Sequence, residues 1–230
     1  VLALSGLHLG ILYALLVMFL GRRRHNILML AFIIIAVWGY TAMVGMPLSL
    51  LRSAFMLTLF TFAQMLQRNN VSLNYLAFAA LVLLLASPWS LWDVGFQMSF
   101  LAVLGILLFN DRLRVFVSHK YLETHPLVNW CFSMIVVSLS AQLMVAPLVA
   151  YYFGRFSCYF LLSNFIAIPL ATVLIYLSVV MYALFFVPCL QGLVAIAVGW
   201  IAKALTLSLA WVSSLPAASV DGIELSNVQL

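Results

Sequence analysis

Apolar runs of about 20 residues follow one another along almost the whole chain, and short polar breaks separate them. Of the residues, 67% are hydrophobic and only 7% are charged, whereas a soluble domain carries about 25% charged residues. A helix of about 20 apolar residues can cross the hydrocarbon core of a bilayer, because its backbone hydrogen bonds are satisfied within the helix. The runs therefore predict an all-α fold, a polytopic bundle of transmembrane helices.

Glycine, proline and charged residues divide the chain into about eight predicted spans. Their expected limits are 3–20, 27–46, 48–66, 72–87, 94–109, 127–150, one span within 158–187, and 190–214. The run 158–187 is too long for one straight span, and it contains Asn164 and Pro169. Because an interior proline removes a backbone hydrogen bond, we expect a broken or re-entrant helix near 158–187. A run that crossed twice would reverse the side on which the chain ends.

Basic residues are distributed unevenly among the predicted loops. The loops after the first, third and fifth spans contain seven of them, namely Arg22, Arg23, Arg24, Arg68, Arg112, Arg114 and Lys120. The loops on the opposite side contain only Arg155. Since cytoplasmic loops carry the excess of lysine and arginine, the distribution predicts that both ends of this chain lie outside the cytoplasm.

Two regions are expected along the chain. Residues 1–214 form the transmembrane domain, and 215–230, where the chain turns polar, form an exit linker toward a further domain. The chain begins with Val1 rather than with methionine, and we expect it to be part of a longer protein.

The first apolar run begins with an unusual combination of a serine, a histidine and two glycines. Ser5 and His8 are three residues apart, so they share one face of a helix. Gly6 and Gly10 are four residues apart and would let another backbone come close. The pattern has two interpretations, a helix-packing seam with a hydrogen-bonded histidine, or a site at which these polar groups bind a ligand.

Other polar side chains lie inside the predicted spans, at Arg52, Gln64, Gln97, Gln142, Asn164 and Lys203. With the orientation above, four of them and His8 lie within about 12 Å of the outer face, which predicts a polar layer there. The four are Arg52, Gln97, Gln142 and Asn164. Each also has a simpler interpretation. Arg52 can reach the interface with its long side chain, and Gln97 and Gln142 can hydrogen-bond a neighbouring helix. Asn164, with Pro169, can mark a structural break in its helix.

The sequence lacks the groups that several activities require. Asp93 is the only acidic residue close to a span, so a carboxylate cluster for two metal ions or for a cation pump is absent. No nucleotide-binding loop is present, and the three cysteines show no metal-binding spacing. We therefore predict no enzymatic activity, no catalytic residue, no metal and no cofactor. An arginine-bearing, acid-poor cavity suits an anion such as a phosphate backbone.

Ordered blocks of the sequence resemble the ComEC family of bacterial competence proteins. Residues 3–10 (ALSGLHLG) are similar to that family's SGLH segment, and residues 95–102 (GFQMSFLA) are similar to its GFQ-S-FLA block. Residues 47–56 (PLSLLRSAFM) look like its proline, arginine and methionine pattern. Further blocks match at 142–147, 152–154 and 164–170, so the likeness covers nearly the whole chain.

This resemblance implies that 1–214 is a transmembrane competence domain, an inner-membrane channel that passes single-stranded DNA into the bacterial cytoplasm during natural transformation. The implied partners are single-stranded DNA, the lipid bilayer, other DNA-uptake proteins including a cytoplasmic ATPase, and soluble domains of the same full-length protein, with a homo-oligomer as an option. The DNA path is then expected at Ser5, His8, Arg52, Phe96, Gln97, Ser99, Gln142 and Asn164. Structural roles are expected for Gly6, Gly10, Pro47 and Pro169.

Two other functions stay open at this point. A small-anion transporter fits the polar layer equally well. Ser5 and His8 could also act as nucleophile and base of an intramembrane hydrolase, although the sequence offers no evident orienting acid or oxyanion donor. Transport of a small solute without DNA would indicate the first, and labelling of Ser5 by a serine-reactive probe would indicate the second.

Overall fold

The computed structural model describes residues 6–20, 27–65, 73–115, 124–216 and 219–221. Almost all of these residues are helical, which confirms the predicted all-α fold. The chain divides into two compact units, Val1–Gln97 and Met98–Leu230, and each is described by itself.

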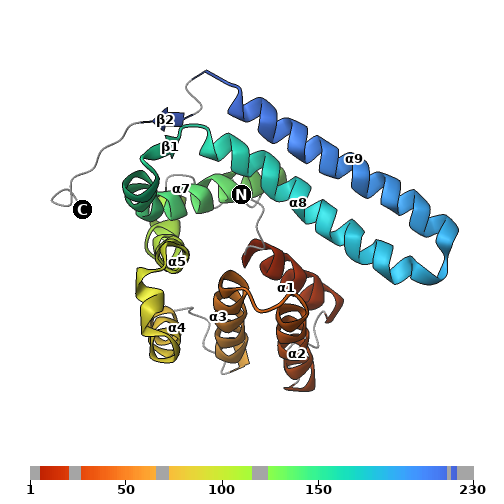
Figure 1. Ribbon diagram of the computed structural model, residues 1–230, viewed down its shortest axis with the longest axis horizontal. Helices are drawn as coiled ribbons and strands as arrows, with labels where there is room; N and C mark the ends of the chain where they lie inside the picture. The colour runs from red at the N-terminus through yellow and green to blue at the C-terminus, as the bar shows by residue number, and fades with distance from the viewer. Residues whose placement is uncertain (1–5, 21–26, 66–72, 116–123, 217–218, 222–230) are drawn as a thin grey trace. The chain divides into compact units, whose positions relative to one another are not determined.

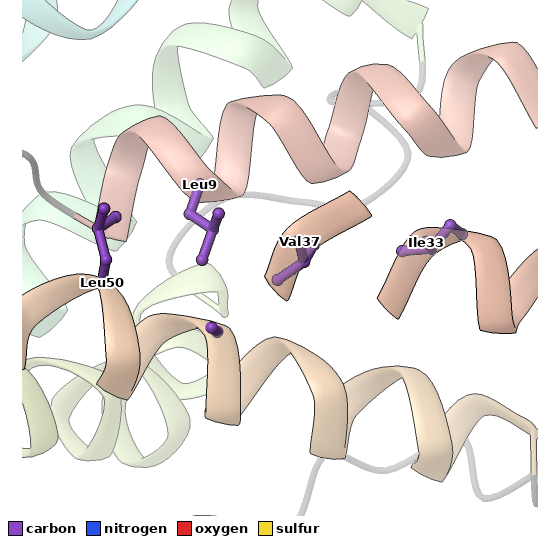
Figure 2. Close-up of a cluster of buried hydrophobic side chains, with 5 residues drawn as sticks. Leu9, Ile33, Val37 and Leu50 are labelled. Carbon is purple, nitrogen blue, oxygen red and sulfur yellow. The ribbon is translucent and has the colours of Figure 1, made fainter. Parts of the chain in front are cut away.

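The first unit consists of apolar helices that pack around α3. Its elements are α1 (Gly6–Leu20), α2 (Ile27–Met43), α3 (Leu48–Met65), α4 (Leu73–Ala86), the 3₁₀ helix η2 (Pro88–Trp92) and the start of α5 (Val94–Arg114) (Figure 1). Helix α3 contacts α1, α2 and α4. Leu9 of α1, Ile33 and Val37 of α2, and Leu50 and Ala54 of α3 form its buried core (Figure 2).

A tight turn joins α2 to α3. Gly45 and Met46 both have positive φ, 91° and 53°, and Pro47 comes directly before the first residue of α3. A left-handed conformation is accessible to glycine without strain, and proline is well suited to the start of a helix because it lacks the N–H. The glycine and the proline therefore end one helix and start the next within a few residues.

Gly6 and Gly10 of α1 have different surroundings. A Cβ atom built at Gly6 would overlap the side chain of Ser53 on α3, whereas one built at Gly10 would have no described heavy atom within 4 Å. The close helix approach expected from this pair of glycines is therefore seen at Gly6, and the described residues give none at Gly10.

The second unit contains the rest of α5, then α7 (Pro126–Phe153), β1 (Arg155–Ser157), α8 (Phe160–Ala183), η3 (Leu184–Phe186), α9 (Pro188–Ser213) and β2 (Ser219–Asp221). Helices α8 and α9 lie side by side as a long helical hairpin, and η3 forms its turn (Figure 1). Within the run 158–187, α8 is therefore one continuous helix followed by the 3₁₀ turn η3, and the predicted break or re-entrant segment is not found. Pro169 lies inside α8 and deprives the Phe165 carbonyl of its N–H partner without ending the helix.

A small antiparallel sheet was not predicted. Strands β1 and β2 pair with Arg155 opposite Asp221 and Phe156 opposite Val220. The hydroxyl of Tyr159 also donates a hydrogen bond to the carbonyl of Pro216 at 3.1 Å. Part of the segment expected as an exit linker is thus attached to the chain just before α8, while its role as a linker stays a prediction.

Four helical segments of the described chain are long and apolar enough to cross a membrane: Val94–Arg114, Pro126–Phe153, Phe160–Phe186 and Pro188–Ser213. Four shorter apolar helices lie within α1 to α4. Large apolar side chains are widely exposed on these helices, for example Met43 and Phe186, each 89% exposed. Such a surface is suited to lipid rather than to water.

Candidate functional site

Arg52 of α3 is the one charged side chain among the described residues that the fold buries, with 8% of the residue exposed. It lies in the second turn of the helix that begins at Leu48. A guanidinium that extended freely from its helix would be exposed, whereas that of Arg52 is covered by neighbouring residues. A buried charge is costly unless an opposite charge and hydrogen bonds compensate it.

Asp93 supplies that opposite charge from the junction between η2 and α5. Nη1 of Arg52 donates to Oδ2 of Asp93, and the two side chains form an ion pair. The same carboxylate accepts hydrogen bonds from the backbone N–H groups of Gly95 and Phe96, each at 3.2 Å. Asp93 thus caps the N-terminus of α5 and also joins α5 to α3.

Gly95 provides the space in which the guanidinium lies. A Cβ atom at this position would be 2.8 Å from Nη2 of Arg52, so any other residue would displace the arginine. Gln97 also connects the neighbouring elements, since its Nε2 donates to the carbonyl of Leu91 in η2 at 2.8 Å. Phe96 is 5% exposed, so no base could stack on its ring in this conformation.

One donor of the guanidinium is not used. Nε of Arg52 is buried and has no hydrogen-bond partner among the described residues. The side chain of Arg52 is 10% exposed, whereas that of Asp93 is 40% exposed. The site is therefore a buried cation covered by a carboxylate that remains accessible.

The ion pair predicts how stability depends on pH. Burial would raise the pKa of Asp93, but hydrogen bonds from Arg52, Gly95 and Phe96 outweigh it and lower the pKa below its usual 3.8. A carboxyl with a lowered folded-state pKa stabilises the fold above its unfolded-state pKa, and this contribution is lost as the pH falls through the folded-state value. We expect Asp93→Asn to lower the melting temperature of the detergent-solubilised chain at neutral pH, and the difference from the parent to shrink below pH 3.8. A difference that persisted unchanged in strong acid would contradict this assignment.

A second polar group lies in the second unit, between α7 and α8. Nδ2 of Asn164 donates to Oγ of Ser138 at 3.4 Å, and Ser138 is buried. The hydroxyl of Ser140, two residues further along α7 and on a different face of that helix, is fully buried and has no hydrogen-bond partner among the described residues. Gln142 and Ser99 are half-buried in the same unit. Asn164 thus connects α8 to α7 and does not mark a break in its helix, and its role in a DNA path stays a prediction.

The structure gathers the predicted site residues in two groups. Arg52, Phe96 and Gln97 lie together in the first unit, and Asn164 belongs to the polar group of the second. His8 is half-buried in α1, while Ser5 lies outside the described residues. A common polar layer that includes both groups therefore stays a prediction.

Sequence reasoning missed two members of the first group as site residues. Asp93 was noted only as the one acidic residue close to a predicted span, and Gly95 only as part of a family block. One signal in the sequence could have indicated the pair. Asp93 is the single acidic residue near a span, and Arg52 is the single arginine within a span, at a similar predicted depth. Lys203 was noted but not assigned; it is exposed on α9, with its ammonium 5.9 Å from the centre of the Trp200 ring.

These helices and their buried ion pair define a helical membrane protein with several apolar segments. The family model described as Competence protein matches residues 1–229. The chain therefore belongs to the Competence protein family.

Relatives from three bacteria support this assignment. The chain is 29% identical to ComE operon protein 3 of Bacillus subtilis over 74% of its own length and 21% of that protein. It is 26% identical to Recombination protein 2 of Haemophilus influenzae over 80% of its length and 24% of that protein. It is 32% identical to an uncharacterised protein of Mycoplasma genitalium over 73% of its length and 40% of that protein. The chain thus spans well under half of these relatives, and no solved structure matches it.

Proposed function

We propose that this chain forms the passage through which single-stranded DNA crosses the inner membrane of a bacterium during natural transformation. The observation that carries the proposal is the match of the Competence protein model to residues 1–229. The formal net charge of +5 and the scarcity of acidic residues suit a polyanionic substrate. A passage of this kind guides the strand and needs no catalytic group of its own.

The residues proposed to meet the strand are polar ones at least partly exposed, namely His8, Gln97, Ser99, Gln142 and Asn164. Amide side chains can donate to phosphate oxygens and to base edges. Arg52 contributes its charge from a buried position, and Phe96 supports α5 from the core instead of stacking on bases. The driving force is proposed to come from other DNA-uptake proteins, including a cytoplasmic ATPase.

Site-specific photo-crosslinking tests the proposed path. A photoreactive amino acid is placed at Gln97 or at Gln142 in competent cells that take up labelled DNA. We expect both positions to capture the incoming strand. The matched control is Ile35, which lies within α2 and is 69% exposed as a lipid-facing residue would be.

Efficient transformation without crosslinking at either glutamine would contradict the proposed path. If the purified chain instead transports a small anion into liposomes and no position captures DNA, the small-anion transporter is the better assignment. Equal crosslinking at Ile35 would show that the label reports collision with the membrane surface and not passage.

A further inference from the structure

The short helix η2, between α4 and α5, presents two tryptophans on its surface. Trp89 is 82% exposed and Trp92 is 73% exposed, and neither indole N–H donates a hydrogen bond to a described residue. An indole has an apolar body and one polar edge, so it is suited to a boundary between an apolar and a polar medium. We propose that η2 is an interfacial anchor: Trp89 and Trp92 bind the boundary between the headgroups and the acyl chains of phospholipids, and they hold Asp93 and its ion pair at this boundary.

The exposed surface of α4 leads directly to these tryptophans. Leu81 and Leu85 are one turn apart on α4, and they are 56% and 75% exposed. Trp89 follows Leu85 after four residues, just past the end of α4, and η2 contacts α4. The apolar surface that is suited to acyl chains therefore ends at the two indoles. Tryptophan is enriched at this level of membrane proteins, where its ring lies among the headgroups.

The charges near η2 favour lipid over a nucleic acid as the partner of the indoles. Exposed tryptophans can also stack on the bases of single-stranded DNA, but such sites combine stacking with cations that bind the backbone. No lysine or arginine occurs anywhere in residues 69–111. Arg52 is paired with Asp93 and only 10% of its side chain is exposed, whereas the carboxylate side chain is 40% exposed. The accessible charge beside Trp92 is therefore negative and would repel a DNA strand.

Hydrogen bonds connect η2 to the start of α5, so the depth of the tryptophans also sets the depth of the ion pair. Nε2 of Gln97 donates to the carbonyl of Leu91 at 2.8 Å, and the N–H of Asp93 donates to the carbonyl of Ser90 at 3.1 Å. A charge costs less among headgroups and water than at the centre of a bilayer. The anchor thus places the exposed carboxylate of Asp93 toward the polar side of the boundary. This placement does not depend on the proposed DNA passage.

Quenching of tryptophan fluorescence by brominated phosphatidylcholine tests the depth of η2 in the full chain. The bromine atoms are placed either near the glycerol ester or near the end of the acyl chain. Variants keep only Trp89 or only Trp92 and have phenylalanine in place of the other tryptophans. We expect the shallow bromines to quench either indole about twofold more strongly than the deep ones. The matched control keeps only Trp200, which is 69% exposed near the middle of α9 and should show the opposite order.

If the variants with one tryptophan do not fold, the parent is compared with Trp89→Phe/Trp92→Phe, which should lose much of the fluorescence that shallow bromines quench. Quenching of Trp89 and Trp92 mainly by deep bromines, as for Trp200, would overturn the interfacial anchor. The absence of quenching by either lipid would overturn it as well. Oligothymidylate added to the reconstituted chain should leave both indoles unchanged. Quenching of Trp89 or Trp92 by oligothymidylate would instead assign η2 to base stacking and contradict the proposed lipid contact.

Discussion

Arg52→Met is expected to reduce DNA internalisation to near background and to lower the melting temperature of the chain. The substitution leaves the Asp93 carboxylate without its cation and removes the ion pair between α3 and the start of α5. Breaking a buried ion pair costs about 3–5 kcal/mol and breaking an exposed one about 0–1 kcal/mol. Since Asp93 is 40% exposed, we expect a loss of about 2 kcal/mol in the free energy of unfolding.

The effect on DNA internalisation is measured by transformant counts and by labelled DNA in the cytoplasm. The effect on stability is measured by thermal melting. Arg112→Met is the matched control, because Arg112 is exposed in the last turn of α5. In the double variant Arg52→Met/Asp93→Asn the unpaired charge is gone, so part of the stability should return while internalisation stays low. Normal internalisation by well-expressed Arg52→Met would remove Arg52 from the DNA path.

Gly105→Leu is expected to disrupt the packing of α5 against α7. A Cβ atom at Gly105 would overlap the backbone carbonyl of Ser140 and would lie 3.2 Å from the Cβ and Cγ of Met144. A backbone atom cannot rotate away as a flexible side chain can, so the two helices must separate. Overpacking of this kind costs about 1–3 kcal/mol, and the separation would also expose the buried Ser140 hydroxyl.

Fluorescence-detected size-exclusion after heating gives the melting temperature of each variant. Gly199→Leu is the matched control, because a Cβ at this exposed helical glycine would have no described heavy atom within 4 Å. We expect the melting temperature of Gly105→Leu to fall by several degrees and that of Gly199→Leu to change little or rise. If Gly105→Leu and Gly199→Leu had equal melting temperatures, α5 and α7 would not be in close contact at Gly105.

The helix limits followed closely from the sequence where a proline or a polar residue interrupts an apolar run. The expected span 72–87 became α4 (Leu73–Ala86), which ends before Pro88, and 127–150 became α7 (Pro126–Phe153), which begins with a proline. Pro169 misled the same reasoning. Helix α8 continues through this proline, because one missing hydrogen bond costs less than ending a helix that packs along α9.

For the candidate site, the sequence indicated some of the residues but not how they pair. Arg52 and Gln97 are conspicuous because polar groups are expensive inside apolar helices. Their arrangement was not apparent, because Asp93, the partner of Arg52, lies 41 positions later in the sequence. Helix α4 and the 3₁₀ helix η2 separate the two residues along the chain. The pairing of 155–157 with 219–221 is equally non-local, and neither short segment is strongly patterned.

Composition and the order of the apolar runs alone determined that this chain is a helical membrane protein. A chain with few charged residues and apolar runs of bilayer length can satisfy its backbone hydrogen bonds in lipid by forming helices. The ordered sequence blocks determined its family. Only the tertiary structure decided that Arg52 is paired with Asp93, that Gly95 makes room for the guanidinium, and that α8 is unbroken. The reason is that these features depend on contacts between segments far apart in the sequence. A local sequence pattern does not show how strong such contacts are.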